Sequence, residues 1–346
     1  MKSLSSMVAA LSVLFLAPQL SSADSKLSPL LKAAQERFSP LPDKPVYKKD
    51  NPASEAKLKL GKMLYFDTRL SKSNVFSCNS CHNIATGGVD NNPFSTGHNW
   101  KVGGRNAPTV FNAALHIAQF WDGRSPDVEA QAQGPILNPI EMGATQELVM
   151  GRIKSIPQYV SLFKEAFPGQ KEAVTYKNLA DAIGAFERAL LTPSRFDEFL
   201  KGNENALSGK EKAGLKMFMD KGCVSCHNGP VVGGGMYQKF GLVNEPDFLK
   251  DRGRVDVTKK EEDLHVFKVP SLRNIALTYP YFNDGSVWDL REAVKIMGWT
   301  QLGDRLTDPE VDSIVTFLNA LTGKQPEVTI PALPPSTPAT AKPDRM

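Results

Sequence analysis

The chain has 346 residues, of which 41% are hydrophobic, so it is long enough to bury real cores and to form roughly two domains. Its 41 Lys and Arg residues against 37 Asp and Glu residues give a formal net charge of only +4. That balance excludes the strongly basic class typical of nucleic-acid-binding proteins, so any docking of a partner must use local charged patches.

Residues 1–23 have the features of a secretory signal. They contain the basic Lys2, an apolar run from about residue 8 to residue 17, and the small residues Ser21-Ser22-Ala23 as a cleavage site. The apolar run is shorter than the roughly 20 residues that span a bilayer, and no other long apolar run follows it. We therefore expect no retained membrane segment and a mature chain that begins near Asp24 in the periplasm.

All four cysteines lie in two short segments, each preceded by a predicted helix that contains Lys-Met, at residues 60–67 and 214–220. Ser208 and Glu211 form a capping-box pattern in front of the second helix. Both cysteine segments read C-x-x-C-H, the attachment signature of c-type haem, in which two thiols bond to the porphyrin and the histidine ligates the iron. The sequence therefore predicts two covalent haem groups. Their residues are Cys78, Cys81 and His82 in the first segment and Cys223, Cys226 and His227 in the second.

Three other uses of these cysteines have to be weighed. Four cysteines in an oxidising compartment often form two disulfides. A thioredoxin-like redox pair needs the C-x-x-C spacing but no histidine, and a zinc site made of two cysteines and one histidine needs a fourth ligand. Because a histidine follows both pairs and every cysteine is used, the haem interpretation is favoured.

The remainder of the chain is duplicated in the same order. Residues 108–123, PTVFNAALHIAQFWDG, align without a gap on residues 270–285, PSLRNIALTYPYFNDG. Residues 183–190 match residues 314–321 at Ile, Phe, Ala and Leu, and the latter segment has apolar residues at helical spacing. Each half therefore consists of a helix, a haem loop, a long connection and a helix. This predicts an all-α fold of two tandem cytochrome c-like domains.

The repeat also predicts the domain boundaries. After the signal peptide at residues 1–23, an N-terminal haem domain covers residues 24–200 and a C-terminal haem domain covers residues 201–325. The junction lies near residues 193–207. The tail at residues 326–346 is rich in proline, so we expect an extended or mobile arm rather than a third domain.

The two halves differ in the residues they offer to a haem iron. Only the second half has a methionine at a suitable distance, Met297, in the predicted helix at residues 288–300. A thioether ligand raises the potential of an electron-transfer haem, although methionines near haem loops are more often part of a hydrophobic core. The first half has His98, Gln131 and Glu141 instead, which suit a reactive haem or, taken singly, a protein surface.

Over nearly its whole mature length the chain resembles the bacterial di-haem cytochrome c peroxidases. The resemblance rests on both C-x-x-C-H loops, on GGRNAPTVFNAA, QFWDGR and GPILNPIEM in the first half, and on VPSLRNIALTYPYF and EAVKIM in the second. It implies two cytochrome c domains packed face to face, usually in a homodimer. The N-terminal domain is implied to hold a low-potential peroxidatic haem, and the C-terminal domain a high-potential electron-transfer haem.

The resemblance also implies roles for single residues. His82 is implied as the proximal ligand of the N-terminal haem and His98 as its displaceable distal ligand. His227 and Met297 are implied as the two ligands of the C-terminal haem. Trp121 stands where the family places a tryptophan between the haems.

Gln131 and Glu141 match the family residues that position and protonate hydrogen peroxide. The implied activity is the reduction of hydrogen peroxide to water with single electrons from a small cytochrome c or cupredoxin. Two alternatives have to be weighed. A non-enzymatic di-haem electron carrier would have two permanently six-coordinate haems. The related enzymes that oxidise tryptophans of a partner protein have tyrosine where this chain has Met297.

Two further features follow from the resemblance. Asn106, together with the backbone carbonyls of Thr278 and Pro280, matches an interdomain calcium site. Asn283 replaces the histidine of the family motif PYFHDG, which lies near the C-terminal haem without ligating its iron. We expect this replacement to change the hydrogen bonding around that haem, and hence its potential.

Overall fold

The computed structural model describes residues 27–344, so the predicted signal peptide lies outside the described part. In that part, helices dominate and the only regular sheet is one antiparallel pair of strands. The predicted all-α class is therefore confirmed. The α-helices are α1 (Pro29–Gln35), α2 (Glu55–Phe66), α3 (Cys78–Cys81), α4 (Val128–Leu137), α5 (Gln146–Lys154), α6 (Pro157–Ala166), α7 (Tyr176–Arg188), α8 (Arg195–Leu200), α9 (Gly209–Asp220), α10 (Val255–Thr258), α11 (Leu290–Met297) and α12 (Asp308–Ala320). The strands are β1 (Tyr237–Lys239) and β2 (Val266–Lys268).

Local capping signals set the starts of the helices in the second half. Ser208 and Glu211 form the predicted capping box of α9, in which the Ser208 N–H donates to the Glu211 carboxylate at 2.8 Å. Thr307 and Glu310 form a second capping box at α12, also at 2.8 Å. Each box satisfies N–H groups that have no partner within the first helical turn.

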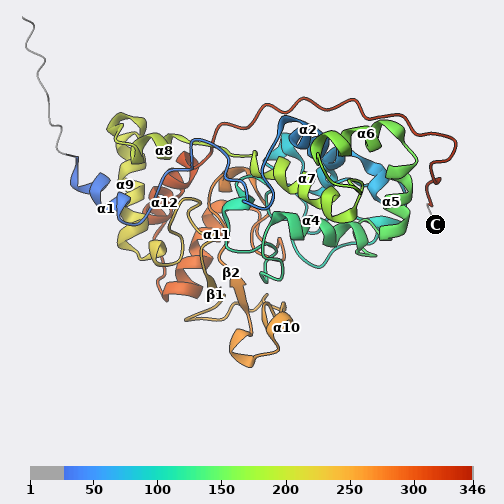
Figure 1. Cartoon of the computed structure of the whole chain (residues 1–346). Coiled ribbons are helices and arrows are strands. Elements are labelled where there is room, and N and C mark those ends of the chain that lie inside the picture. Colours follow the sequence, from blue (N-terminus) through green and yellow to red (C-terminus); the bar gives the residue numbers. More distant parts are fainter. Residues whose placement is uncertain (1–26, 345–346) are drawn as a thin grey trace, which may run out of the picture.

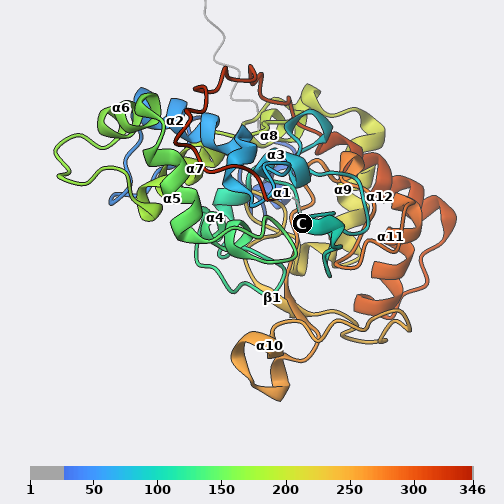
Figure 2. The same ribbon diagram turned by 90° about the vertical axis from the view of Figure 1, so that its right-hand side faces the viewer.

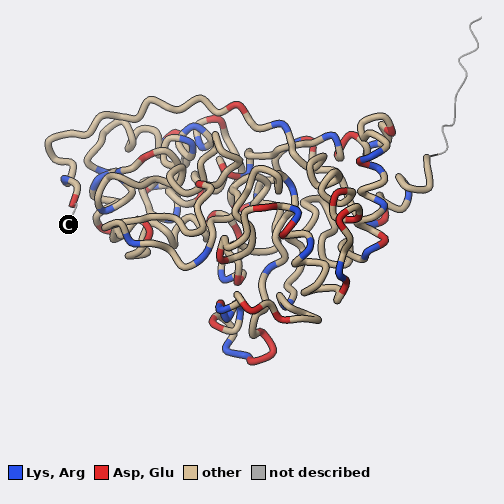
Figure 3. The backbone as a smooth tube through the Cα atoms, turned by 180° about the vertical axis from the view of Figure 1, so that it is seen from behind, with Lys and Arg blue, Asp and Glu red and all other residues tan. Residues whose placement is uncertain are grey.

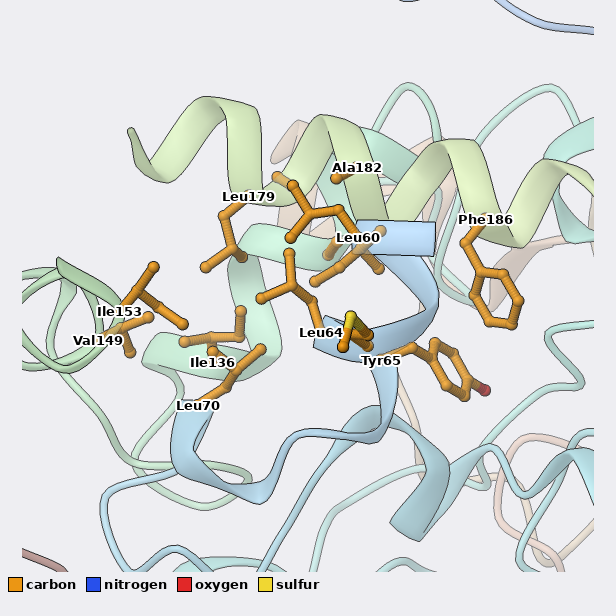
Figure 4. Close-up of a cluster of buried hydrophobic side chains, with 14 of the residues drawn as sticks. Leu60, Leu64, Tyr65, Leu70, Ile136, Val149, Ile153, Leu179, Ala182 and Phe186 are labelled. Atoms are coloured by element: carbon orange, nitrogen blue, oxygen red, sulfur yellow. The ribbon is translucent and has the colours of Figure 1, made fainter. Parts of the chain in front are cut away.

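The first hydrophobic core lies between α2, α4, α5, α6 and α7 (Figure 4). Helix α2 crosses α7 at Gly61, where a Cβ atom would lie 1.9 Å from the Ala182 carbonyl oxygen and 3.0 Å from the Phe186 Cβ. Only glycine allows such a close approach of the two helices. Fully buried side chains fill the space around the crossing, among them Leu60, Leu64, Tyr65, Ile136, Val149 and Leu179.

The second core repeats this crossing with α9 and α12. A Cβ atom on Gly214 would lie 2.1 Å from the Ser313 carbonyl oxygen and 2.9 Å from the Phe317 Cβ. Gly214 is therefore the counterpart of Gly61. When the two helices are aligned on these glycines, their Lys-Met pairs are offset by one position. The close helix crossing requires the glycine but not the Lys-Met pair.

The two halves meet at Thr192, which is fully buried. Asn112 and Asn274, the aligned asparagines of the repeat, both donate from Nδ2 to its hydroxyl, at 2.7 and 2.8 Å. Both asparagines adopt left-handed backbone angles, with φ of 60° and 61°. The duplicated segments thus contact one shared side chain, and this contact helps to hold the halves together.

The N-terminal part of the described chain packs against the second half. Leu31 of α1 and Phe38 belong to the second core, where the Phe38 ring lies 5.3 Å from that of Phe196 in α8. Both α1 and α8 lie within residues 24–200, so these contacts cross the domain boundary that the sequence predicts. The repeat pattern contains no information about these contacts, because neither helix is part of the aligned segments.

The C-terminal part of the described chain, conversely, packs against the first half. Residues 326–344 run as an extended arm along the first half (Figure 1). Arg152 of α5, only 1% exposed, donates to the carbonyl oxygens of Ala341 and Lys342 at 3.1 and 3.0 Å. The tail is thus extended, as expected, and it lies against the protein.

Three further features concern the outside of the molecule. The segment between β1 and β2, which includes α10, projects from the helical body (Figures 1 and 2). Basic and acidic positions are interspersed along the chain (Figure 3). Across residues 27–344, no helix has the length and apolar character needed to cross a membrane.

Candidate functional site

The first C-x-x-C-H segment forms one wall of a cavity of about 1100 Å³, which Cys78, Cys81 and His82 all line. Burial raises the pKa of Cys78 above the usual thiol range and the pKa of Cys81 to about 11. A thioredoxin-like pair needs the opposite shift, since its reactive thiol has a lowered pKa. The surroundings of these thiols therefore disfavour the redox alternative.

The backbone orients the ring of His82. Its Nδ1 atom lies 2.9 Å from the carbonyl oxygen of Pro108, which can only accept, so Nδ1 carries the proton and Nε2 keeps its lone pair. Burial lowers the pKa of His82, which also favours the neutral ring. A neutral imidazole that donates its other N–H to a carbonyl is the usual form of a metal-ligating histidine.

The second C-x-x-C-H segment lines a second cavity, of about 280 Å³. Cys223, Cys226 and His227 line it together with Met297, the last residue of α11. Burial lowers the pKa of His227 to about 4, against the effect of two backbone carbonyls, and this favours the neutral ring. The structure thus brings together the four side chains of this half that the sequence predicts as haem-binding.

Both cavities offer donor sets that fit c-type haem. Each combines two thiols with a neutral imidazole, and the second adds a thioether. All four cysteines are free, so neither disulfide is formed. Among residues 27–344, no three His, Cys, Asp or Glu side chains cluster in a way that could hold a metal ion. The disulfide and zinc alternatives therefore gain no support.

Gln131 and Glu141 also line the first cavity. Asn138 holds the Glu141 carboxyl group by donating from Nδ2 to Oε1 at 3.0 Å. Burial raises the pKa of Glu141, while Arg124 and Asn138 act in the opposite direction. A carboxyl group with a raised pKa is better suited than an exposed one to take up and return a proton near neutral pH.

Trp121 lines both cavities. Its Nε1 donates to the carbonyl oxygen of Asn106 at 2.8 Å, and its own carbonyl oxygen accepts from the backbone N–H of Lys268 at 2.8 Å. Hydrogen bonds from both halves of the chain therefore fix this tryptophan at the boundary between the cavities.

The residues expected at a calcium site all line the second cavity. Asn106 lines both cavities, and Thr278 and Pro280 line the second. The Asn106 Nδ2 group donates to the Asn92 carbonyl oxygen at 2.9 Å, which leaves the Oδ1 atom as its potential metal ligand. Amide and carbonyl oxygens are among the ligands that calcium prefers.

His98 is not brought to the first cavity. It is 4% exposed, its N–H donates to the Glu141 carbonyl oxygen at 2.6 Å, and it is absent from the cavity lining. A Cβ atom on Gly143 would lie 2.7 Å from the His98 ring, so the ring packs directly against that glycine. The structure thus places His98 behind the backbone of Glu141, apart from His82.

Asn283, the departure from the family motif, lines both cavities and is buried. Its Nδ2 donates to Asp251 Oδ2 at 3.0 Å, and the same oxygen accepts from Arg105 Nε at 2.6 Å. Its carbonyl oxygen accepts from the Asn106 N–H at 2.7 Å. Asn283 therefore belongs to a polar network that joins the two halves.

Glu187 is one of several ionisable residues of the first cavity that were not predicted from the sequence. Glu187 of α7 is 7% exposed and lines the cavity. Burial, together with the charge of Glu129, raises its pKa to about 8, against the effect of Arg188. The signal was present in the repeat, because Glu187 aligns with Leu318, which lines the second cavity.

Comparisons with known proteins agree with this arrangement. Residues 55–205 match the family described as di-haem cytochrome c peroxidase, and residues 211–322 match the cytochrome c family. Cytochrome c551 peroxidase of Pseudomonas aeruginosa is 51% identical over 315 residues, which cover 90% of this chain and 91% of that protein. This chain belongs to the di-haem cytochrome c peroxidase family. A second family member, cytochrome c551 peroxidase of Nitrosomonas europaea, is 50% identical over 88% of this chain and 89% of its own length.

A solved structure supports the same fold. The crystal structure of a MauG-like protein associated with microbial copper homeostasis is 29% identical, with a TM-score of 0.73. The match covers 88% of this chain and 98% of that one. The predicted tandem cytochrome c architecture is thereby confirmed for the described residues.

Proposed function

We propose that this chain reduces hydrogen peroxide to water with electrons from a small cytochrome c or cupredoxin. The observation that carries the proposal is the pair of cavities with different ligand sets, which share Trp121 as a wall. The balanced reaction converts two ferrocytochromes c, one hydrogen peroxide and two protons into two ferricytochromes c and two waters.

Each haem would be held by the residues that line its cavity. The peroxidatic haem would be held by Cys78, Cys81 and His82. The electron-transfer haem would be held by a second set of residues, which includes Met297 as an additional ligand. When bound, the haems supply an iron that reacts with peroxide and an iron that stores an electron. The second set is Cys223, Cys226, His227 and Met297.

The protein moves the proton that peroxide cleavage requires. Glu141 takes a proton from one peroxide oxygen and returns it to the other, which then leaves as water. Gln131 orients the peroxide by hydrogen bonding, and Asn138 keeps the carboxyl group of Glu141 in place. Glu141 thus ends the cycle in the protonation state in which it began.

Two residues control access and electron flow in this proposal. Trp121 lies at the boundary between the cavities and is the side chain through which an electron passes from the second site to the first. His98 would be the displaceable ligand of the first iron. His98 lies behind Glu141 and does not line the first cavity, so it would have to move in order to reach that iron.

We further propose that calcium binds at Asn106 and at the carbonyls of Thr278 and Pro280, and that it keeps the boundary between the halves rigid. The active protein is a homodimer in the periplasm, exported by the signal at residues 1–23. The signal pattern supports export, and the presence of Asn106, Thr278 and Pro280 in the lining of one cavity supports the calcium site.

Stopped-flow kinetics test the peroxidase function. Half-reduced protein mixed with hydrogen peroxide and ferrocytochrome c is expected to oxidise two cytochromes for each peroxide consumed. An electron carrier would exchange electrons with cytochrome without consuming peroxide, and that result would refute the proposal. The alternative of partner-protein oxidation is less favoured, because Met297 lines the second cavity where those enzymes have tyrosine.

A further inference from the structure

Two polar side chains of the second cavity have no role in the function proposed above. Lys268, the last residue of β2, and His116, from the first half, both line this cavity. Lys268 is only 6% exposed, and its Nζ lies 2.9 Å from His116 Nδ1. Burial lowers the pKa of Lys268 to about 8, and no charged partner acts against this effect.

The direction of their hydrogen bond is determined by the ammonium group. Because an ammonium can only donate, His116 Nδ1 accepts and the ring carries its proton on Nε2. Burial and the neighbouring Lys268 charge lower the pKa of His116 well below its ordinary value, so the ring is neutral. Within residues 27–344, the buried Nε2 atom has no hydrogen-bond partner. The pair therefore presents N–H groups that need an acceptor.

The two cavities also differ in the charged side chains that line them. The described side chains lining the second cavity include no Asp or Glu, and Lys268 is the only lysine or arginine among them. The first cavity is lined by groups of both signs, such as Arg105, Glu141 and Glu187. An isolated buried cation is costly unless an anion pairs with it. No described side chain of the second cavity therefore supplies an anion that could pair with Lys268.

We infer that Lys268, supported by His116, binds a carboxylate of the haem in the second cavity and raises the reduction potential of that haem. The inference rests on the proposed function only in requiring a haem at this site. A haem carries two propionate carboxylates, whose negative charge favours the oxidised iron. A lysine ammonium in a cavity of low dielectric offsets that charge and so favours the reduced iron. Lys268 thereby acts in the same direction as Met297.

Spectroelectrochemical titration of the haem-loaded protein tests this role. Lys268→Met keeps the length and apolar stem of the side chain and removes the charge. At a fixed ambient potential, we expect the ratio of reduced to oxidised second haem to fall at least tenfold, which is 59 mV for a one-electron couple. Lys268→Arg, which keeps the charge, should restore most of the ratio, and the first haem should titrate as in the wild type.

Lys239→Met is the matched control, since Lys239 lies on β1 of the same sheet and lines neither cavity. It removes one charge as well and should leave both potentials unchanged. Lys268→Gln keeps N–H donors without the charge and should behave like Lys268→Met. It also serves as the test if the methionine variant does not take up haem.

Each outcome has a defined meaning. A wild-type potential of the second haem in Lys268→Met or Lys268→Gln overturns the inference. Failure of both to bind the second haem, with normal loading of Lys268→Arg, supports it, because a cation is then needed at that position. Failure of all three contradicts it, since charge would not be the deciding property. Wild-type protein without covalent haem, or without peroxide consumption, would instead defeat the proposed function.

Discussion

Replacing Glu141 by Gln removes the proton-accepting oxygen from the first cavity while keeping the shape of the side chain. Asn138 Nδ2 donates to Glu141 Oε1 at 3.0 Å, and the amide oxygen of Gln can accept the same bond. We therefore expect normal folding and haem loading. Turnover should fall by about 10²–10⁴-fold, the usual effect of a positioned acid–base group. This corresponds to about 2.7–5.4 kcal/mol of activation free energy, at about 1.36 kcal/mol for each tenfold.

The dependence on pH gives the same prediction a second readout. The carboxylate form of Glu141 must accept the proton, so wild-type turnover declines as the pH falls through the pKa of this group. Because burial raises that pKa, the decline should occur at a higher pH than for an exposed carboxyl group. The residual turnover of Glu141→Gln should show no such decline.

Stopped-flow assays on half-reduced protein with ferrocytochrome c would measure both effects. Glu147→Gln is the matched control, because Glu147 is an exposed glutamate of α5 that lies outside both cavities. It should keep wild-type turnover and pH dependence. Wild-type turnover in Glu141→Gln would refute the reasoning and leave Glu141 as an ordinary half-buried carboxyl group.

Four further changes test other parts of the site. Met297→His should lower the potential of the second haem, because imidazole stabilises the oxidised iron more than a thioether does; reduction by ferrocytochrome c, followed in the visible spectrum, should then be lost, and normal reduction would contradict the assignment. His98→Ala should give an oxidised first haem that is five-coordinate or water-bound and needs no prior reduction, whereas a spectrum that still shows two histidine ligands would disprove its role. Glu187→Gln should raise the melting temperature at pH values above about 8. The pKa of Glu187 in the folded protein lies above its ordinary value, so the stability that this residue contributes at low pH is lost as the pH rises through the folded-state pKa. The variant, which has no ionisable group at this position, avoids that loss. Removal of calcium with a chelator should lower the melting temperature and added calcium should restore it, as measured by calorimetry; no change would argue against the site at Asn106.

Features with a short sequence spacing were predictable. The cysteine loops, the capping box at Ser208 and the position of Met297 on a helix each depend on a few neighbouring residues or on the repeat. The repeat also identified Asn112 and Asn274 as counterparts, although only the structure shows that both contact Thr192.

Features that join distant segments were not predictable. The pair of His116 and Lys268 spans 152 positions, and the repeat gave no reason to expect it. The location of His98 depends on a hydrogen bond to the backbone of Glu141 and on the space beside Gly143. Neither leaves a periodic signal, since both arise from the way separate loops pack.

The exchange of the chain ends has a consequence for biosynthesis. The second core includes α1, which is made before the other helices of that core, and Arg152 in the first half has carbonyl partners in Ala341 and Lys342, which are made after α12. Neither half can therefore complete its native contacts while the other is still being translated. We expect the haem loops to stay accessible to the machinery that attaches the cofactor until both of these contacts have formed.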